Sequence, residues 1–222
     1  TNNIAHELRT PVSSIRGYIE TLLEQPHITP DKQHFFLERT HSQIVRLSDL
    51  IRDIALITKT EEASELFDKE QVNVHNTLQE VINDLHSPIV AHGINVKNEI
   101  NPQTVIEGNK TLVYAIFRNL IENSINYAGD HISIGVNNYM EDKEFYYFSY
   151  YATGQGIEEN HLNRIFERFY RVCEGRSRQN GGSGLGLSIV KNAVLFHKGD
   201  ISAKNRKDGG LEFLFSLKKT LF

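Results

Sequence analysis

The sequence predicts a helical hairpin at residues 1–64 followed by an α+β sandwich at residues 65–222. Up to about residue 58, apolar residues recur every three or four positions, which is the period of an amphipathic helix. From about residue 70, short segments of alternating apolar and polar residues are interspersed with helical segments, as in α+β folds. A polar stretch at 61–70 separates the two patterns, and 222 residues are enough for two domains.

The first domain is expected to contain two long helices. The first ends at Gln25-Pro26, and the second begins at Thr29-Pro30-Asp31, where proline suits the first turn. Because one hairpin buries little apolar surface, we expect a dimer that forms a four-helix bundle. The apolar stripe of the first helix consists of Ile4, Leu8, Val12, Ile15, Ile19 and Leu22. The second helix carries a seam with coiled-coil spacing, formed by Ile44, Leu47, Ile51, Ile54 and Thr58.

The second domain reads as an ordered series of strands and helices. Its segments predict a mixed or antiparallel sheet with helices on one face, in which 94–100 and 104–106 pair as a hairpin. Strands are expected at 69–74, 94–100, 104–106, 132–139, 144–151, 201–203 and 211–217. Helices are expected at 76–91, 110–127 and 185–197. A long irregular stretch at about 153–183 is expected to contain one short helix near 162–169.

The composition excludes several classes of protein. Apolar residues make up 39% and charged residues 23%, as in ordinary soluble domains, and a net charge of −4 gives no reason to expect nucleic acid binding. The single cysteine, Cys173, excludes an intrachain disulfide and fits a reducing compartment. No apolar run of about 18 residues is present to span a membrane. The chain opens inside a helix already under way, so we expect an upstream region.

The residues HELRTP that begin at His6 carry the most functional information in the chain. His6 lies two positions from both Ile4 and Leu8, so it points away from the apolar stripe and is not a core histidine. The carboxylate of Glu7 follows it, and the hydroxyl of Thr10 comes one helical turn later. This arrangement suits a histidine that is chemically modified; a solvated histidine is the alternative.

Glycine-rich turns stand at two places in the second domain. GGSGLGL at 181–187 precedes an apolar helix, so its backbone N–H groups and the helix dipole favour a phosphate. Its spacing is not that of a P-loop, and it does not follow the strand of a dinucleotide-binding unit. A second pair, Gly154 and Gly156, ends the strand 144–151. This pair is either a strand-ending turn or a backbone segment that passes close to a ligand ring.

Two groups of polar residues suit a phosphate ligand. Asn119 and Asn123 share one helix face, which Asn126 and Tyr127 continue. Asparagine is a poor helix former, and amide oxygens beside a phosphate suit Mg²⁺, although a solvated polar face is the alternative. The irregular stretch holds arginines that form either a set of phosphate partners or a solvated charge run. They are Arg164, Arg168, Arg171, Arg176 and Arg178.

Together, and in this order, the motifs resemble those of the sensor histidine kinases of two-component signalling, over essentially the whole chain. HELRTP resembles the phosphoacceptor box, 119–127 the N box, 154–157 the first glycine box, 166–169 the F box and 182–187 the second glycine box. The resemblance implies a sandwich of the GHKL (Bergerat) type that binds ATP and Mg²⁺. It also implies a homodimer that acts on the receiver domain of a response regulator. The chain would be the cytoplasmic portion of an inner-membrane sensor, associated with the membrane only through an upstream region.

The resemblance assigns roles to the matching residues of the phosphoacceptor box. His6 would receive the γ-phosphoryl group of ATP, and Glu7 would act as general base or orient the ring. Thr10 would help to place a water for dephosphorylating the response regulator. These roles would combine a kinase and a phosphatase on one surface.

The resemblance assigns the nucleotide to the second domain. Asn123 would be the main Mg²⁺ ligand, Asn119 would lie near the phosphates and Tyr127 beside the nucleotide. Arg168 or Arg171 would steady the γ-phosphate. The whole nucleotide-binding set would be Asn119, Asn123, Asn126, Tyr127, Ala152, Gly154, Gly156, Ile157, Arg168, Arg171, Gly182, Gly184, Leu185, Gly186 and Leu187.

Ala152 departs from the family pattern, in which an aspartate at this position accepts a hydrogen bond from the adenine amino group. Loss of a charge-assisted hydrogen bond of roughly 1.5–3 kcal/mol would weaken ATP binding by about ten- to a hundredfold. Selection of adenine over guanine would suffer with it. The other boxes are intact, which favours a substitution introduced to weaken nucleotide binding; a natural loss of kinase activity is the alternative. Asn126, where the family often has lysine, is a smaller departure.

Two other functions compete with the kinase. The chain would be a phosphatase-dominant or regulator-docking module with little kinase activity if Ala152 reflects a natural loss of function. Another ATPase of the same fold, such as a chaperone, mismatch-repair or topoisomerase type, is disfavoured because those proteins lack the HExxTP helix.

Overall fold

A computed structural model describes residues 2–25, 27–62, 67–172 and 183–220. The chain divides into two compact units, residues 1–56 and 57–222, which we describe separately. Within the described ranges, none of the helices combines the length and the hydropathy that a crossing of the bilayer requires.

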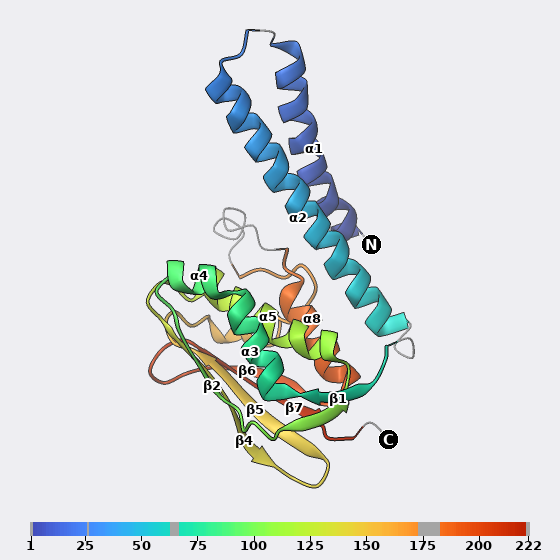
Figure 1. Cartoon of the computed structure of the whole chain (residues 1–222), viewed down its shortest axis with the longest axis vertical. Helices are drawn as coiled ribbons and strands as arrows, with labels where there is room; N and C mark the ends of the chain where they lie inside the picture. Colours follow the sequence, from blue (N-terminus) through green and yellow to red (C-terminus); the bar gives the residue numbers. More distant parts are fainter. Residues whose placement is uncertain (1, 26, 63–66, 173–182, 221–222) are drawn as a thin grey trace. The chain divides into compact units, whose positions relative to one another are not determined.

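The first unit is the predicted helical hairpin (Figure 1). α1 (Asn2–Glu24) continues through Pro11, and α2 (Pro30–Glu62) begins with proline in its first turn, where a missing N–H costs nothing. Tyr18 packs against Phe36 across the hairpin, with ring centroids 5.9 Å apart. The predicted seam of α2 divides between two environments, because Leu47 is half-buried whereas Ile51 is 55% exposed.

The second unit contains a mixed five-stranded sheet, as predicted, in the order β2-β4-β5-β7-β6. β2 and β4 are parallel, and the other neighbours are antiparallel. The strands are β2 (Asn95–Glu99), β4 (Ser133–Glu141), β5 (Phe145–Ala152), β6 (Ile201–Asn205) and β7 (Leu211–Lys218). A second, two-stranded sheet pairs β1 (Glu70–Asn73) with β3 (Val105–Gly108).

The predicted hairpin between 94–100 and 104–106 is wrong. The chain does turn there, since the N–H of Thr104 donates to the carbonyl of Asn101, but β2 pairs with β4 and β3 pairs with β1. The turn is held from outside, because the Asn101 N–H donates to Asn138 Oδ1 on β4 at 2.8 Å. Alternation of apolar residues identifies a strand but does not identify its partner.

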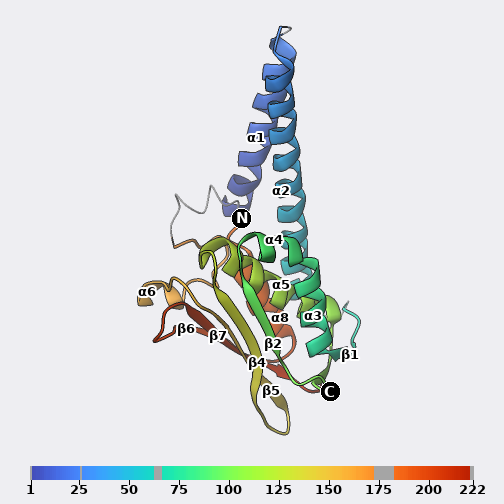
Figure 2. The same ribbon diagram turned by 60° about the vertical axis from the view of Figure 1, so that its left-hand side comes forward.

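Helices cover one face of the larger sheet, as both ribbon views show (Figures 1 and 2). The segment predicted as one helix at 76–91 is two, since Pro88 has no N–H to continue the hydrogen-bond ladder. The short helix predicted near 162–169 lies a few residues earlier, at Glu159–Leu162. The helices are α3 (Val74–Asp84), α4 (His86–Ala91), α5 (Lys110–Tyr127), α6 (Glu159–Leu162) and α8 (Gly186–Phe196).

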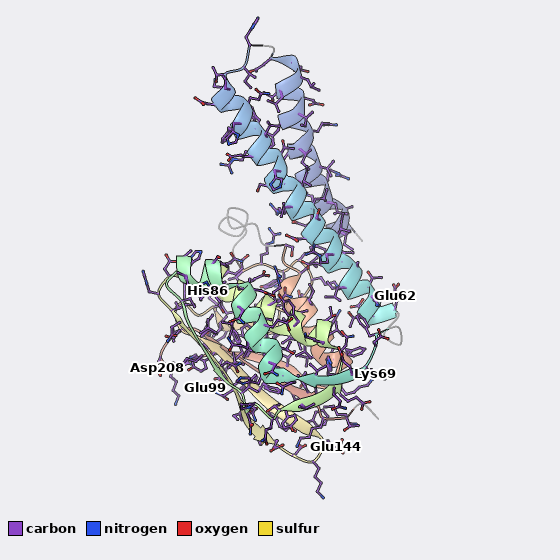
Figure 3. The ribbon with its side chains drawn as sticks, in the orientation of Figure 1. Glu62, Lys69, His86, Glu99, Glu144 and Asp208 are labelled. Atoms are coloured by element: carbon purple, nitrogen blue, oxygen red, sulfur yellow. The ribbon has the colours of Figure 1, made fainter. Side chains whose placement is uncertain are left out.

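The core lies between the sheet and α3, α5 and α8, and Figure 3 draws the side chains of these elements as sticks. Alternate residues of β5 face the helices: Phe148 and Tyr150 are fully buried. The Tyr150 hydroxyl donates to the Leu120 carbonyl at 2.9 Å and lies 2.7 Å from the Ser124 hydroxyl, which sets α5 on the sheet. Burial raises the pKa of Tyr150, so its hydroxyl stays neutral.

Candidate functional site

Ala152 is the last residue of β5 and lies opposite Ile134 on β4 and Leu211 on β7. Its side chain has the same direction as those of Phe148 and Tyr150, toward the helices, and it is only 4% exposed. The position at which the family carries an aspartate therefore faces the layer that holds α5 and α8. With alanine at this position, β5 remains paired with both β4 and β7.

The first half of the loop after β5, residues 153–155, is held by contacts with β4 and with the end of α5. Thr153 exchanges two hydrogen bonds with Ser133, both at 2.9 Å. Gly154 has a φ of +110°, and a β-carbon on it would overlap the carbonyl oxygen of Ala128 at the end of α5. The Gln155 N–H donates to that same oxygen at 3.3 Å. Gly154 is thus required by both backbone conformation and space.

The second half of this loop is fixed by a residue that the motifs do not include. The Ile157 N–H donates to Asn205 Oδ1 at 3.0 Å, and Asn205 Nδ2 donates to the Ile157 carbonyl at 2.7 Å. A β-carbon on Gly156 would lie 2.5 Å from Asn205 Oδ1. A lone asparagine at a strand end carries no sequence signal, so only its spatial proximity to the loop identifies it.

The predicted N box and second glycine box meet in the structure. The side chain of Asn119 donates from Nδ2 to the Ala115 carbonyl, and its Oδ1 would lie 2.8 Å from a β-carbon on Gly186, the first residue of α8. Close packing of α5 against the start of α8 therefore needs glycine at this position. Asn123 is half-buried one turn later on α5, while Asn126 and Tyr127 are exposed.

The second glycine box is joined to the F box through the backbone. The Phe169 N–H donates to the Gly184 carbonyl at 2.8 Å, and both residues have positive φ, +63° and +72°. Leu185 is buried, and its carbonyl accepts a hydrogen bond from the Ser188 hydroxyl at 2.7 Å. Leu187 lies in the first turn of α8, whose N-terminal backbone amides and dipole suit an anion. Gly182 lies outside the described residues.

The arginines of the irregular stretch have separate environments. Arg168 forms an ion pair with Glu61, whose carboxylate also accepts a hydrogen bond from Asn192 Nδ2 at 3.0 Å. The hydrogen bond from Arg168 holds the pKa of Glu61 below its usual value. Arg164 stacks on the ring of Tyr170, 4.3 Å from the centroid. Arg171 is half-buried, and Cys173, Arg176 and Arg178 lie outside the described residues.

The first unit presents His6 to solvent, with 66% of its side chain exposed. Its Nδ1 atom lies 3.9 Å from Glu7 Oε1, and the other carboxylate oxygen of Glu7 lies 3.9 Å from Arg46 Nη2 on α2. The Thr10 hydroxyl donates to the His6 carbonyl at 3.3 Å, one turn back along α1. Within the phosphoacceptor box, His6 and Thr10 are thus exposed on one helix, and Glu7 is half-buried between them.

The residues present fit a nucleotide with one magnesium ion. In the described ranges, no three His, Cys, Asp or Glu side chains cluster as a metal site. Mg²⁺ commonly takes one or two protein oxygens, keeps waters and shares the phosphates of its nucleotide. The amide oxygen of Asn123 and the backbone amides at the N-terminus of α8 are groups that suit such an ion and the phosphates it binds.

Two family models match the sequence. Residues 1–63 match the His Kinase A (phospho-acceptor) domain, and residues 108–221 match the histidine kinase-, DNA gyrase B-, and HSP90-like ATPase. The first match includes the exposed His6, and the second includes α5, α8 and the loop after β5.

Curated relatives and solved structures agree with the family models. The chain is 30% identical over 95% of its length to the phosphate regulon sensor protein PhoR of Pseudomonas aeruginosa, and 31% identical over 97% to the sensor histidine kinase WalK of Bacillus subtilis. It spans 47% and 35% of those proteins, so about half or less of each. A crystal structure of histidine kinase ThkA in complex with response regulator protein TrrA matches 99% of this chain and 61% of that chain, with 23% identity and a TM-score of 0.76. That likeness shows the fold.

Proposed function

The chain belongs to the sensor histidine kinases, with a phospho-acceptor domain and an ATPase domain of the histidine kinase-, DNA gyrase B- and HSP90-like family, and on this basis we propose that it phosphorylates itself on His6. The phosphoryl group then passes to an aspartate on the receiver domain of a response regulator. The observation that carries the proposal is an exposed histidine beside a carboxylate, on a chain that also holds an ATPase domain. Residues 1–64 would supply the acceptor, and 65–222 the donor.

The acceptor chemistry follows from the position of the ring. We assign the ring proton of His6 to Nδ1, which lies 3.9 Å from Glu7 Oε1, and this leaves the Nε2 lone pair to attack the γ-phosphorus. A bond forms between Nε2 and phosphorus, the bond from the γ-phosphorus to the bridging oxygen breaks, and ADP leaves with the electron pair. Glu7 orients the ring and accepts the Nδ1 proton. The Arg46 side chain, 3.9 Å from the other carboxylate oxygen of Glu7, would help to hold that carboxylate in place.

The donor site would be built from α5 and α8. The backbone amides at the start of α8, from Gly186 and Leu187 onward, would hold phosphate oxygens, with Asn119 beside them. Mg²⁺, held by Asn123 and phosphate oxygens, would neutralise charge on the transferring group. The loop 153–157 would pass along the base, and Arg168 or Arg171 would stabilise the γ-phosphate.

Exposed apolar residues of the hairpin support the proposed homodimer. Val12 on α1 and Ile44 and Ile51 on α2 are each about half exposed in the single chain. A second copy that covers them would complete a four-helix bundle. Thr10, on the exposed face with His6, would serve dephosphorylation of the regulator. The proposed place of this core is the cytoplasmic side of a membrane sensor, reached through an upstream region.

Ala152 is the observation that favours a second function. Without a carboxylate at this position, binding of ATP would be weak, and a phosphatase-dominant or regulator-docking role would be the main activity of this chain. That role needs the exposed Thr10 helix but does not need the base-reading group.

Incubation with γ-labelled ATP and Mg²⁺ tests the kinase proposal. We expect slow, acid-labile labelling that His6→Gln abolishes and Ala152→Asp accelerates. Acid-stable label, or label that survives His6→Gln, would contradict it. No labelling even in Ala152→Asp, together with Thr10-dependent loss of phosphate from a phosphorylated receiver domain, would favour the second function.

A further inference from the structure

We infer that Asn205 is a positioning residue for the nucleotide: its side chain holds the second half of the loop 153–157 in the shape that receives the base. Asn205 is the last residue of β6 and lies outside every motif recognised in the sequence. The inference rests on the proposed function, because it assigns this loop to the nucleotide.

The carboxamide of Asn205 pairs with the backbone of Ile157 in the way that a neighbouring strand would. It accepts the Ile157 N–H at 3.0 Å and donates to the Ile157 carbonyl at 2.7 Å, so it satisfies both backbone groups of one residue. This two-bond ring fixes position and orientation together, which a single hydrogen bond does not. A side chain at Gly156 would approach Asn205 Oδ1 to 2.5 Å, so glycine there allows the ring to close.

The turn after β6 continues this contact along the loop. A β-carbon on Gly210 would overlap the Ala152 carbonyl oxygen, and one on Gly209 would lie 3.1 Å from the Gly154 carbonyl oxygen. The turn is itself closed by the Arg206 N–H, which donates to the Gly210 carbonyl at 3.0 Å. The β6–β7 turn therefore packs along the backbone of the loop, and Asn205 supplies its directional contact.

The two halves of the loop are held independently. Ser133 and Ala128 fix residues 153–155 from one side, whereas Asn205 fixes Ile157 from the other. None of these contacts uses the side chain at position 152. The loop shape thus does not depend on an acid there, and removal of the Asn205 carboxamide would release Gly156 and Ile157 while β5 stays paired.

The test compares Asn205→Ala and Asn205→Asp with a matched control, Lys204→Ala, which removes an exposed side chain one residue earlier on β6. Each is made in the chain as it stands and in Ala152→Asp. Amide hydrogen exchange of Ile157 is measured without nucleotide, and KM for ATP and kcat of His6 labelling are measured with it. Asn205→Asp keeps an acceptor for the Ile157 N–H but loses the donor to its carbonyl.

We expect Asn205→Ala to accelerate exchange of the Ile157 amide and to raise KM by roughly three- to thirtyfold with little change in kcat, as two lost hydrogen bonds imply. Asn205→Asp should be intermediate, and Lys204→Ala should match the parent. Unchanged exchange, or a fall in kcat and thermal stability at constant KM, would overturn the inference. If labelling is not saturated by ATP in either the parent chain or Ala152→Asp, the proposed function fails. Amide exchange of Ile157 then still decides whether Asn205 holds the loop.

Discussion

Nε2 of His197 accepts a hydrogen bond from the backbone N–H of Asn109 at 3.1 Å. Nδ1 of the same ring donates to the Ala193 carbonyl at 2.7 Å, so the contacts fix one neutral tautomer. The residue joins the end of α8 to Asn109, whose own side chain caps α5 by accepting the Leu112 N–H. Its ring also fills the space that a side chain at Gly108 would need. Both helices of the proposed nucleotide site therefore depend on an uncharged histidine.

Stability should fall as the pH is lowered from about 6.5 to about 4. Burial lowers the pKa of His197 to about 4 from an ordinary value of 6.5, so the unfolded chain binds the proton first. The contribution is complete above pH 6.5, and the pKa difference corresponds to a loss of about 3 kcal/mol below pH 4. Urea unfolding at several pH values measures it. His197→Gln should be less stable at pH 7.5 and lose this part of the pH dependence; an unchanged slope would contradict the assignment.

Gly154→Ala should remove nucleotide binding, whereas Gly129→Ala should retain it. Both glycines have strongly positive φ, +110° and +102°, so alanine costs roughly 1–3 kcal/mol of backbone strain at each. A β-carbon at Gly154 would also overlap the Ala128 carbonyl, but one at Gly129 would meet open space. The pair separates the overlap from the strain. Titration with an ATP analogue and thermal unfolding measure both effects, and equal losses at the two positions would refute the distinction.

Ala152→Asp should lower the stability of the nucleotide-free protein and raise its affinity for ATP. The position is buried, so an unpaired carboxylate there costs roughly 1–3 kcal/mol. Adenine nucleotide supplies the missing partner, so ATP should raise the melting temperature more in the variant than in the parent. GTP, whose base carries different exocyclic groups, should not raise the melting temperature more in the variant than in the parent. Equal responses to ATP and GTP would exclude position 152 as the reader of the base.

Glu61→Gln should accelerate labelling of His6 by about two- to fivefold, because exposed ion pairs contribute below about 1 kcal/mol. The carboxylate of Glu61 holds Arg168, one of the two arginines proposed for the γ-phosphate. The neutral amide would release that guanidinium for phosphate. Glu62→Gln, which changes charge equally at the next residue, is the control. A rate equal to that of the control would mean that Arg168 is not the arginine that acts on phosphate.

The sequence predicts a strand or helix well where the local pattern of apolar residues is enough to specify it. Period-two alternation locates β4, β5 and β7, and three-four spacing locates α1, α5 and α8. The pairing of strands is not predicted as well. The segment 104–106 does form a strand, but its partner is β1 and not the segment 94–100. Pairing depends on contacts far along the chain, such as that between Asn101 and Asn138, which no local pattern encodes.

The candidate site shows the same division. Motif glycines are identifiable from sequence because backbone conformation or close approach demands them, as at Gly154 and Gly186. Asn205 is not, because an asparagine that ends a strand is ordinary until its neighbour in space is known. The resemblance to the sensor histidine kinases implies a phosphate role for Arg168 or Arg171, whereas the ion pair of Arg168 with Glu61 is visible only in the folded chain.

The hydrogen bond from Phe169 to Gly184 also bears on how such a protein can diverge. It joins the two ends of the segment 170–183, so the spacing between those ends does not depend on the length of the segment. The entropy of closing a segment grows slowly with length, by about 0.6 kcal/mol for each doubling. A change in the length of the connection between Phe169 and Gly184 should therefore cost the fold little, because the same hydrogen bond closes it.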